Sequence, residues 1–304
     1  MITVRTVADV RAAVSQARRA GESVGLVPTM GAFHEGHLSL MRRARERCDR
    51  VVVSLFVNPA QFNEQADLDG YPRDEGRDVT LAAEAGADFL FAPLAEEIYP
   101  PGFAATVSVA GLTETLEGAQ RGRGHFDGVA TVVTKLFNIV SPDVACFGQK
   151  DAQQVAVIRQ LVRDLNMPVQ IEVCPTVREH DGLAMSSRNG RLSGSERERA
   201  TVLHRALAAA KESVAAGERD ATAIKSAAMT MLTSAGVEPE YFELVSPDTL
   251  APARRIEGEV LALVAARVGT TRLIDNEVIA GPGMNGNTSA DRQVATLTAA
   301  SAAN

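Results

Sequence analysis

An almost uninterrupted apolar run, VVVSLFV at residues 51–57, constrains the fold of this chain more than any other feature. A strand that is apolar at nearly every position has both faces covered, which is typical of a parallel sheet between two layers of helices. Similar apolar segments recur through the first half, at 24–27, 88–91, 144–147 and 169–173. Segments with helical spacing separate them, at 36–47, 74–85, 126–140 and 151–165. The alternation predicts an α/β domain with a doubly wound parallel sheet.

The pattern changes after residue 176. Ser193 or Ser195 is predicted to cap a long Ala-rich helix that runs to about Ala216, and a second helix is predicted over Ala221–Ser234. Three strands are predicted after them, at 241–245, 260–268 and 271–278. Helices followed by strands indicate a separate α+β domain. We therefore expect one domain over 1–176, a smaller one over 177–280, and a mostly disordered tail over 281–304.

Charge and composition exclude several classes of protein. The formal net charge of -7 argues against a nucleic-acid partner, because phosphate backbones are bound by an excess of Lys and Arg. The three cysteines are widely spaced, so we expect free thiols in a reducing cytosol. The N-terminus lacks the pattern of a signal peptide, and no apolar run reaches the roughly 18 residues of a membrane span. These features predict a cytoplasmic protein with no membrane partner.

The segment Pro28–His37, PTMGAFHEGH, contains the strongest candidate for a functional site. It follows the first core strand and opens a helix, which is where a doubly wound sheet binds its ligand. His34 and His37 are three residues apart, so both imidazoles can face the same way. Gly31 and Gly36 let the backbone approach a ligand, and the free N–H groups of a helix start favour an anion. The segment predicts a triphosphate site. A metal pair and incidental histidines are the alternatives, but a zinc site lacks further ligands.

Two further polar blocks follow later in the chain. Phe147–Asp151, FGQKD, ends a predicted strand and leads into a helix, so Lys150 offers a positive charge for phosphate. Asp151 stands at the expected N-cap. Met185–Asn189, MSSRN, combines two hydroxyls with the Arg188 guanidinium, groups that suit the oxygens of a leaving pyrophosphate. Taken alone, each block fits an ordinary structural role better.

The segment Asn58–Phe62, NPAQF, follows the apolar run at 51–57. Polar amides at the end of a buried strand are candidates for substrate contacts. Asn58 fits the role of a turn residue equally well, so this segment by itself leaves both interpretations open.

Together, PTMGAFHEGH, FVNPAQF, FGQKD with the paired glutamines, and MSSRN resemble the pantothenate synthetase family, whose members have HxGH-type nucleotidyltransferase signatures. The resemblance covers about residues 1–280 and includes GTTRLIDN and the stretch ending Gly124-His125-Phe126. It implies a Rossmann-like domain and a smaller α+β domain that closes over the site, in a homodimer. It also implies an ATP-dependent ligase: pantoate, β-alanine and ATP give pantothenate, AMP and pyrophosphate through a pantoyl-adenylate, with Mg²⁺ on the phosphates.

The resemblance also implies roles for residues at matching positions. ATP is expected to contact Met30, Gly31, Ala32, Phe33, His34, Glu35, Gly36, His37, Gly148, Gln149, Lys150, Asp151, Val177, Met185, Ser186, Ser187 and Arg188. His37 matches the family's proton donor, and we assign neutralisation of the phosphates to it together with His34, Lys150 and Arg188. Gln61 and Gln154, with Asn58, are expected to bind pantoate and β-alanine. No protein ligand for Mg²⁺ is identified.

The chain departs from the family pattern at several positions. Gln149 stands where the family usually has Glu, and Ala152 stands where an aromatic residue is common. The stretch QRGRGH at 120–125 is one residue longer than the usual form, so either Arg121 or Arg123 fills the role of the single family arginine. No residue is an obvious base for the amine of β-alanine.

Two other functions compete with a ligase. A nucleotidyltransferase with a similar histidine signature would leave the nucleotide on its product, whereas a ligase releases free AMP. A nucleotide-binding regulatory protein would bind ATP without releasing pyrophosphate. An aminoacyl-tRNA synthetase fits less well, because the chain is short and acidic.

Overall fold

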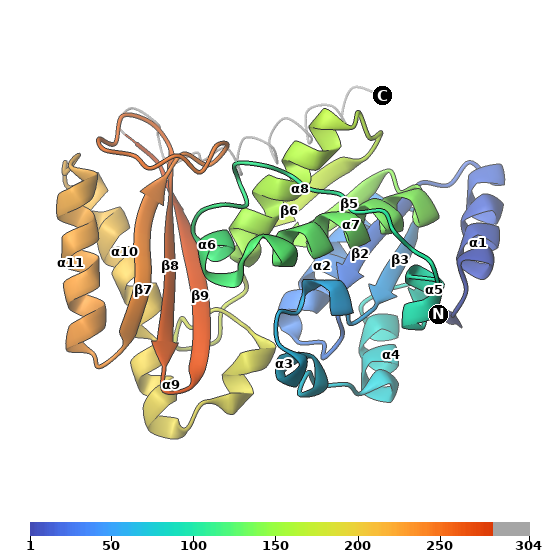
Figure 1. The fold of residues 1–304 in the computed structure, drawn as a ribbon, viewed down its shortest axis with the longest axis horizontal. Helices are drawn as coiled ribbons and strands as arrows, with labels where there is room; N and C mark the ends of the chain where they lie inside the picture. Colours follow the sequence, from blue (N-terminus) through green and yellow to red (C-terminus); the bar gives the residue numbers. More distant parts are fainter. Residues whose placement is uncertain (282–304) are drawn as a thin grey trace. The chain divides into compact units, whose positions relative to one another are not determined.

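A computed structural model gives the fold and describes residues 1–281 (Figure 1). The chain forms two compact units, of which the first contains Met1–Val177 and the short segment Met185–Ser187. The second contains Arg178–Ala184 and the chain from Arg188 onward. The division after Val177 lies close to the predicted boundary at 176, but the return of Met185–Ser187 to the first unit was not predicted. The tail expected over 281–304 lies, apart from Gly281, outside the described residues.

The first unit is built on a six-stranded parallel sheet, which confirms the predicted fold class. Its strand order is β1-β4-β3-β2-β5-β6. The next strands along the chain, β3 and β4, therefore lie on one side of β2, and β5 and β6 lie on the other. The direction of strand addition reverses between β2 and β5, and doubly wound sheets bind their ligands at such a switch point. The strands are β1 (Ile2–Val4), β2 (Val24–Thr29), β3 (Arg50–Leu55), β4 (Phe89–Phe91), β5 (Val144–Gly148) and β6 (Gln170–Cys174).

Helices cover both faces of this sheet. Leu26 and Val27 are neighbours on β2 and point to opposite faces: Leu26 packs with Val133 of α7, and Val27 packs with Met41 of α2. Helices α1 and α8 join α7 on its face, and α4 joins α2 on the other. Both faces of β2 and β3 are therefore buried, which explains their continuous apolar sequences. The main helices are α1 (Val7–Arg19), α2 (Glu35–Arg47), α4 (Glu75–Glu84), α7 (Arg123–Val140) and α8 (Ala152–Asp164).

Short helical segments connect these elements in the first unit. They are the 3-10 turns η1 (Pro59–Gln61) and η2 (Gln149–Asp151), with α3 (Gln65–Asp69), α5 (Ala95–Ile98) and α6 (Glu117–Arg121). A third 3-10 turn, η3 (Ser187–Arg191), begins in the first unit and ends in the second.

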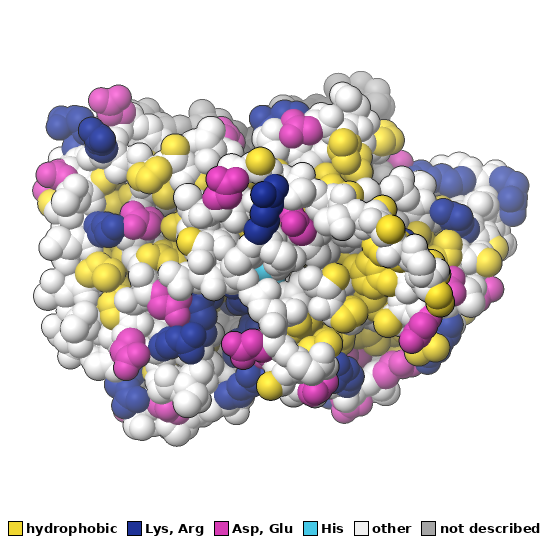
Figure 2. All heavy atoms as spheres, viewed as in Figure 1, with side chains coloured by type: hydrophobic (Ala, Val, Ile, Leu, Met, Phe, Trp, Pro, Cys, Tyr) yellow, Lys and Arg dark blue, Asp and Glu magenta, His cyan; other side chains and the backbone are white. Residues whose placement is uncertain are grey.

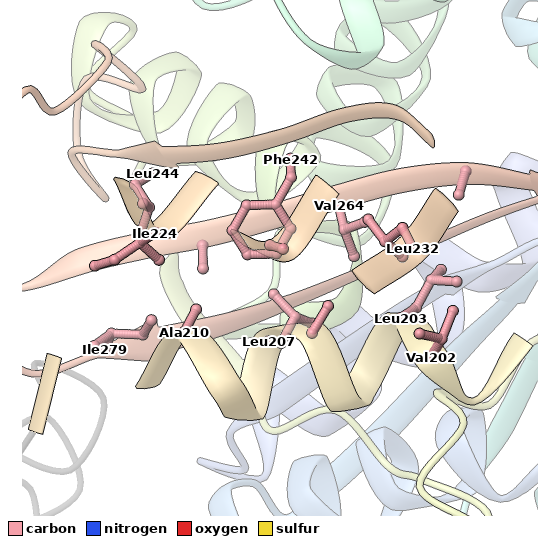
Figure 3. Packing of buried hydrophobic residues seen from close by; sticks show 14 of the residues in the cluster. Val202, Leu203, Leu207, Ala210, Ile224, Leu232, Phe242, Leu244, Val264 and Ile279 are labelled. Carbon is pink, nitrogen blue, oxygen red and sulfur yellow. The ribbon is translucent and has the colours of Figure 1, made fainter. Parts of the chain in front are cut away.

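The second unit is an antiparallel three-stranded sheet covered by helices, as predicted. Its core consists of aliphatic side chains around Phe242, with Leu207 of one helix and Leu232 of the other packed near Val264 of the central strand (Figure 3). The strands are β7 (Glu238–Val245), β8 (Val260–Val268) and β9 (Thr271–Ile279), and the helices are α9 (Gly194–Ala200), α10 (Val202–Ala215) and α11 (Ala221–Ser234).

One predicted helix is interrupted. The single helix expected to run to about Ala216 is instead two helices, α9 and α10, which meet at Thr201. The Thr201 hydroxyl donates to the Glu198 carbonyl oxygen at 2.7 Å, a local side-chain bond that competes with regular helix geometry. Ser193, not Ser195, caps α9, and it forms a capping box with Glu196.

The approach of α7 to η1 gives a test of the packing. A Cβ atom on Gly128 would lie 2.3 Å from the Ala60 carbonyl oxygen, whereas one on Gly124 of the same helix would meet nothing within 4 Å. We predict that Gly128→Ala lowers the free energy of unfolding by about 1–3 kcal/mol, the usual cost of overpacking. Gly124→Ala should be neutral or stabilising by up to about 1 kcal/mol. Urea denaturation of the two variants measures both values, and equal losses would contradict the assigned packing.

Candidate active site

The carboxyl ends of β2, β3 and β5 carry most of the residues predicted to be functional. Met30 and the histidine turn follow β2, Asn58 and η1 follow β3, and Gly148 and η2 follow β5. These three strands are adjacent in the sheet, so segments far apart in the sequence meet at one edge of the first unit (Figure 1). The edge coincides with the switch point between β2 and β5.

The turn between β2 and α2 has an unusual backbone that Asp78 of α4 stabilises. Gly31 and Ala32 both have positive φ, 86° and 52°. The buried carboxylate of Asp78 accepts hydrogen bonds from the N–H groups of Ala32 and Phe33, each at 2.8 Å. Gly31 is needed there, because a Cβ would lie 2.6 Å from Cδ1 of Leu55.

Asp78 is a site residue that the sequence did not indicate. The free N–H groups expected from the sequence are those of the helix start, and α2 begins at Glu35, after Ala32 and Phe33. At that helix start the N–H of Gly36 is bonded to Nδ1 of His34. The segment of Asp78, DEGRDV, has no motif spacing, and a single acidic residue on a helix gives no signal of its own.

The two imidazoles are oriented by backbone N–H groups. Nδ1 of His34 accepts from Gly36 N at 3.2 Å, and Nδ1 of His37 accepts from His34 N at 3.4 Å. A backbone N–H can only donate, so in each neutral ring the proton is on Nε2. The ring centroids are 4.2 Å apart. The site therefore contains two neighbouring Nε2–H donors. The ring of His34 also caps the start of α2, a role that Ser or Asp commonly has.

Burial lowers the pKa of His37 to about 3, with smaller contributions from the nearby positive charges of His34 and Lys150. At neutral pH the ring is therefore uncharged, and it acts on a ligand as a hydrogen-bond donor rather than as a cation. Lys150 of FGQKD is thus near enough to His37 to lower its pKa, and the role of this lysine stays a prediction. Asp151 occupies the N-cap of α8, but its side chain makes no capping hydrogen bond.

The segment NPAQF forms a small hydrogen-bonded network. Asn58 is buried, and its amide nitrogen donates to Oε1 of Gln61 at 3.0 Å. Gln61 is partly exposed, and its own amide nitrogen contacts Sδ of Met30 at 3.0 Å. Tyr99, which the sequence did not indicate, donates its hydroxyl to Oδ1 of Asn58 at 2.8 Å. Asn58 thus lies behind Gln61 and supports it, and Gln61 is the member of the pair with accessible surface.

Helix α7 adds another residue that sequence reasoning did not assign. Nδ1 of His125 lies 2.7 Å from the carbonyl oxygen of Gln61, which can only accept, so Nδ1 carries the proton. Burial lowers the pKa of His125, more than the Gln61 carbonyl raises it, and the charge of Arg121 lowers it further. Arg121 is therefore close to this part of the site. Arg123 is exposed and reaches Ser108 instead, at 3.4 Å.

Of the paired glutamines on α8, only one has accessible surface. Gln153 is buried, and its amide bonds to Leu112, Thr115 and Glu117 of the preceding loop. Gln154 is partly exposed, so it is the one of the two that a ligand can reach.

The loop of MSSRN is divided between the two units. The N–H of Met185 donates to the carbonyl of Val177 at 2.9 Å, and a Cβ built on Gly36 would lie 3.8 Å from Cβ of Met185. Met185, with Ser186 and Ser187, therefore belongs to the unit that holds the histidine turn. Arg188 belongs to the second unit, and its role stays a prediction.

Neither a metal cluster nor a membrane span is found among residues 1–281. That part of the chain contains no group of three or more His, Cys, Asp or Glu side chains arranged to hold a metal ion. None of its helices combines the length and the apolar character needed to cross a bilayer. On the face drawn in Figure 2, basic and acidic side chains are interspersed.

Comparisons with known proteins identify relatives over nearly the whole chain. The family model described as pantoate-beta-alanine ligase matches residues 2–278. The pantothenate synthetase of Cereibacter sphaeroides is 56% identical over 273 residues, which cover 90% of this chain and 98% of that protein. That of Pseudomonas fluorescens is 55% identical over 278 residues, covering 91% and 97%.

Solved structures agree with these relatives. A crystal structure of pantothenate synthetase from Thermus thermophilus has a TM-score of 0.86 and 48% identity, covering 91% of this chain and 99% of that one. The pantoate-beta-alanine ligase of Francisella tularensis, solved in complex with beta-gamma ATP and beta-alanine, has a TM-score of 0.77 and 33% identity, covering 91% and 97%. With a family model that matches residues 2–278, a relative that is 56% identical and a solved structure with a TM-score of 0.86, the chain belongs to the pantoate-beta-alanine ligase family.

Proposed function

We propose that this enzyme activates pantoate with ATP as a pantoyl-adenylate and then transfers the pantoyl group to β-alanine. Family membership supports the coarser statement, that it forms pantothenate from pantoate and β-alanine. The Francisella relative, which was solved with beta-gamma ATP and beta-alanine, supports ATP and β-alanine as substrates. The observation that carries the two-step scheme is the clustering of paired Nε2–H donors, Lys150 and the Gln61 amide at one sheet edge.

In the first step a pantoate carboxylate oxygen attacks the α-phosphorus of ATP, and the bond to the pyrophosphate oxygen breaks. Two anions must meet, so the site has to stabilise the charge that develops on the phosphates. Lys150 supplies a positive charge, and the rings of His34 and His37 supply Nε2–H donors, that of His37 as an uncharged group. Ser186 and Ser187 are proposed donors to the β- and γ-phosphates, and the Arg188 guanidinium is proposed to contact the phosphates as well.

Magnesium belongs to the proposal as an ion carried by ATP. Mg²⁺ is commonly held by substrate phosphates with one or two protein carboxylates, and residues 1–281 offer no ready cluster of ligands. When bound, the ion would neutralise phosphate charge. The homodimer is likewise a proposal that rests on the family resemblance, and the cytoplasmic location is a proposal that rests on the sequence features described above.

In the second step the uncharged amine of β-alanine attacks the acyl carbon, and AMP leaves as the acyl C–O bond to phosphate breaks. AMP is a far better leaving group than oxide, which is why the carboxylate must first be activated. Gln61 and Gln154 are proposed to orient the acid during both steps. We assign no base for the ammonium proton.

The two-step scheme predicts partial reactions. Pantoate and ATP without β-alanine should support exchange of labelled pyrophosphate into ATP, because the adenylate forms before the amine enters. An exchange assay with a panel of hydroxy acids checks this and tests selectivity for pantoate. An absolute requirement for β-alanine would contradict the scheme, and a stable nucleotidyl product would point to a nucleotidyltransferase instead.

The neutral state of His37 predicts a graded response to substitution. His37→Ala and Lys150→Ala should each lower the rate of adenylate formation by roughly 100-fold or more, the scale for losing one preorganised donor. His37→Gln should retain more activity than His37→Ala, because a glutamine N–H can replace Nε2–H but cannot transfer a proton. Equal rates for the two His37 variants in single-turnover assays would instead indicate proton transfer by the imidazole.

The lowered pKa of His37 also predicts acid sensitivity. In the unfolded chain this side chain takes up a proton near pH 6.5, but in the fold it does so only near pH 3. Between these values the unfolded state binds more protons, so the free energy of unfolding should fall as the pH falls, by at most about 1.4 kcal/mol per unit. Urea denaturation from pH 7 to 4 should show a shallower decline in His37→Gln. Parallel declines would show that His37 is not buried in its neutral form.

A further inference from the structure

The orientation of the Asn58 side-chain amide is fixed by two backbone groups of opposite character. Its nitrogen Nδ2 lies 3.1 Å from the carbonyl oxygen of Gly128, which can only accept a hydrogen bond. Its oxygen Oδ1 lies 3.3 Å from the N–H of Ala60, which can only donate. A flipped amide would place donor against donor and acceptor against acceptor. The buried Asn58 therefore has a single favourable orientation.

This orientation determines which end of Gln61 faces outward. The Asn58 nitrogen can only donate, so the Gln61 atom 3.0 Å away from it must be the oxygen Oε1. The other end of the Gln61 amide is then the nitrogen, one of whose hydrogens points to Sδ of Met30 at 3.0 Å. An amide nitrogen has two hydrogens, so Gln61 offers an N–H to a ligand rather than a carbonyl oxygen.

Tyr99, the residue directly after α5, completes this chain of hydrogen bonds. Its hydroxyl donates to Oδ1 of Asn58 at 2.8 Å. Burial raises the pKa of Tyr99 to about 12, so the phenol keeps its proton and stays a donor at neutral pH. Its ring is held by Phe103 at a centroid distance of 5.1 Å and by Phe56 at 6.2 Å. The hydroxyl is thus presented to Asn58 by an aromatic cluster separate from the substrate residues.

We propose that Tyr99 is a positioning residue for the acid substrate, acting through Asn58 so that Gln61 presents an N–H donor. The subsite would then select a ligand with an acceptor oxygen, as the carboxylate and hydroxyl groups of pantoate provide. This inference rests on the proposed function, because it assigns Gln61 to the acid. In this proposal Tyr99 reaches Gln61 only through Asn58.

The test compares Tyr99→Phe, which removes only the hydroxyl, with Phe103→Leu, which alters packing on the same ring and leaves the hydroxyl in place. In the pyrophosphate exchange assay, Tyr99→Phe should raise the KM for pantoate by roughly three- to tenfold, the value of one hydrogen bond. The KM for ATP should stay unchanged. Phe103→Leu should leave the KM for pantoate near that of the unaltered enzyme. A pantoate KM that is unchanged in Tyr99→Phe, or raised equally by both variants, would overturn the proposal.

A second measurement reports on the amide directly. In ¹⁵N-labelled enzyme the side-chain NH₂ signals of Gln61, assigned by their absence in Gln61→Leu, should shift when pantoate is added. In Tyr99→Phe they should broaden or move before pantoate is added. Signals that are identical in both proteins would overturn the role of Tyr99. If the unaltered enzyme shows no pantoate-dependent exchange at all, the proposed function fails, whereas normal exchange with an unaffected Tyr99→Phe refutes this inference alone.

Discussion

The buried carboxylate of Asp78 accepts hydrogen bonds from two consecutive backbone N–H groups, those of Ala32 and Phe33. These bonds hold a turn in which two successive residues have positive φ, a conformation that costs free energy for Ala32. The turn places His34 at the start of α2, and His34 in turn orients His37. The positions of both imidazoles at the carboxyl edge of the sheet thus depend on a carboxylate from another helix.

The chemistry of the site differs from a simple cluster of positive charges. His37 is neutral because of its burial and its positive neighbours, so the group that it can offer to a ligand is a directed N–H and not a positive charge. Lys150 carries the positive charge, and the imidazoles supply N–H donors with fixed directions. On the other side of Met30, Gln61 is held at its carbonyl by His125 and at its side chain by Asn58. In both arrangements, backbone groups that can only donate or only accept a hydrogen bond fix the orientation of the side chains. The donors are therefore preorganised before the substrate binds.

Much of the fold was predictable because its signals are local. The apolar runs of β2 and β3 indicated a sheet buried on both faces, and α11 and β8 begin and end at the predicted residues. The strand β1 was missed because three residues at a sheet edge give no periodic pattern. Helix α1 did carry signals that could have been used, since Thr6 caps it and Val10, Val14 and Ala17 form one buried face.

The site was predictable only where its residues stand next to one another in the sequence. The histidine turn and FGQKD were found as motifs, and their proximity followed from strand order. Asp78, Tyr99 and His125 each act through one or two hydrogen bonds to residues at least 41 positions away, and no sequence spacing predicts such contacts. The pKa of His37 was equally hidden, because burial depends on the packed structure.

Nucleotide affinity in Asp78→Asn tests the dependence of the site on this carboxylate most directly. The substitution keeps the shape of the side chain but turns an NH₂ group toward one of the two backbone N–H groups. Calorimetric titration with ATP should give a Kd raised by roughly tenfold or more, the scale for a hydrogen bond to a charged group, while circular dichroism shows the variant still folded. An unchanged Kd for ATP in a folded Asp78→Asn protein would contradict the account.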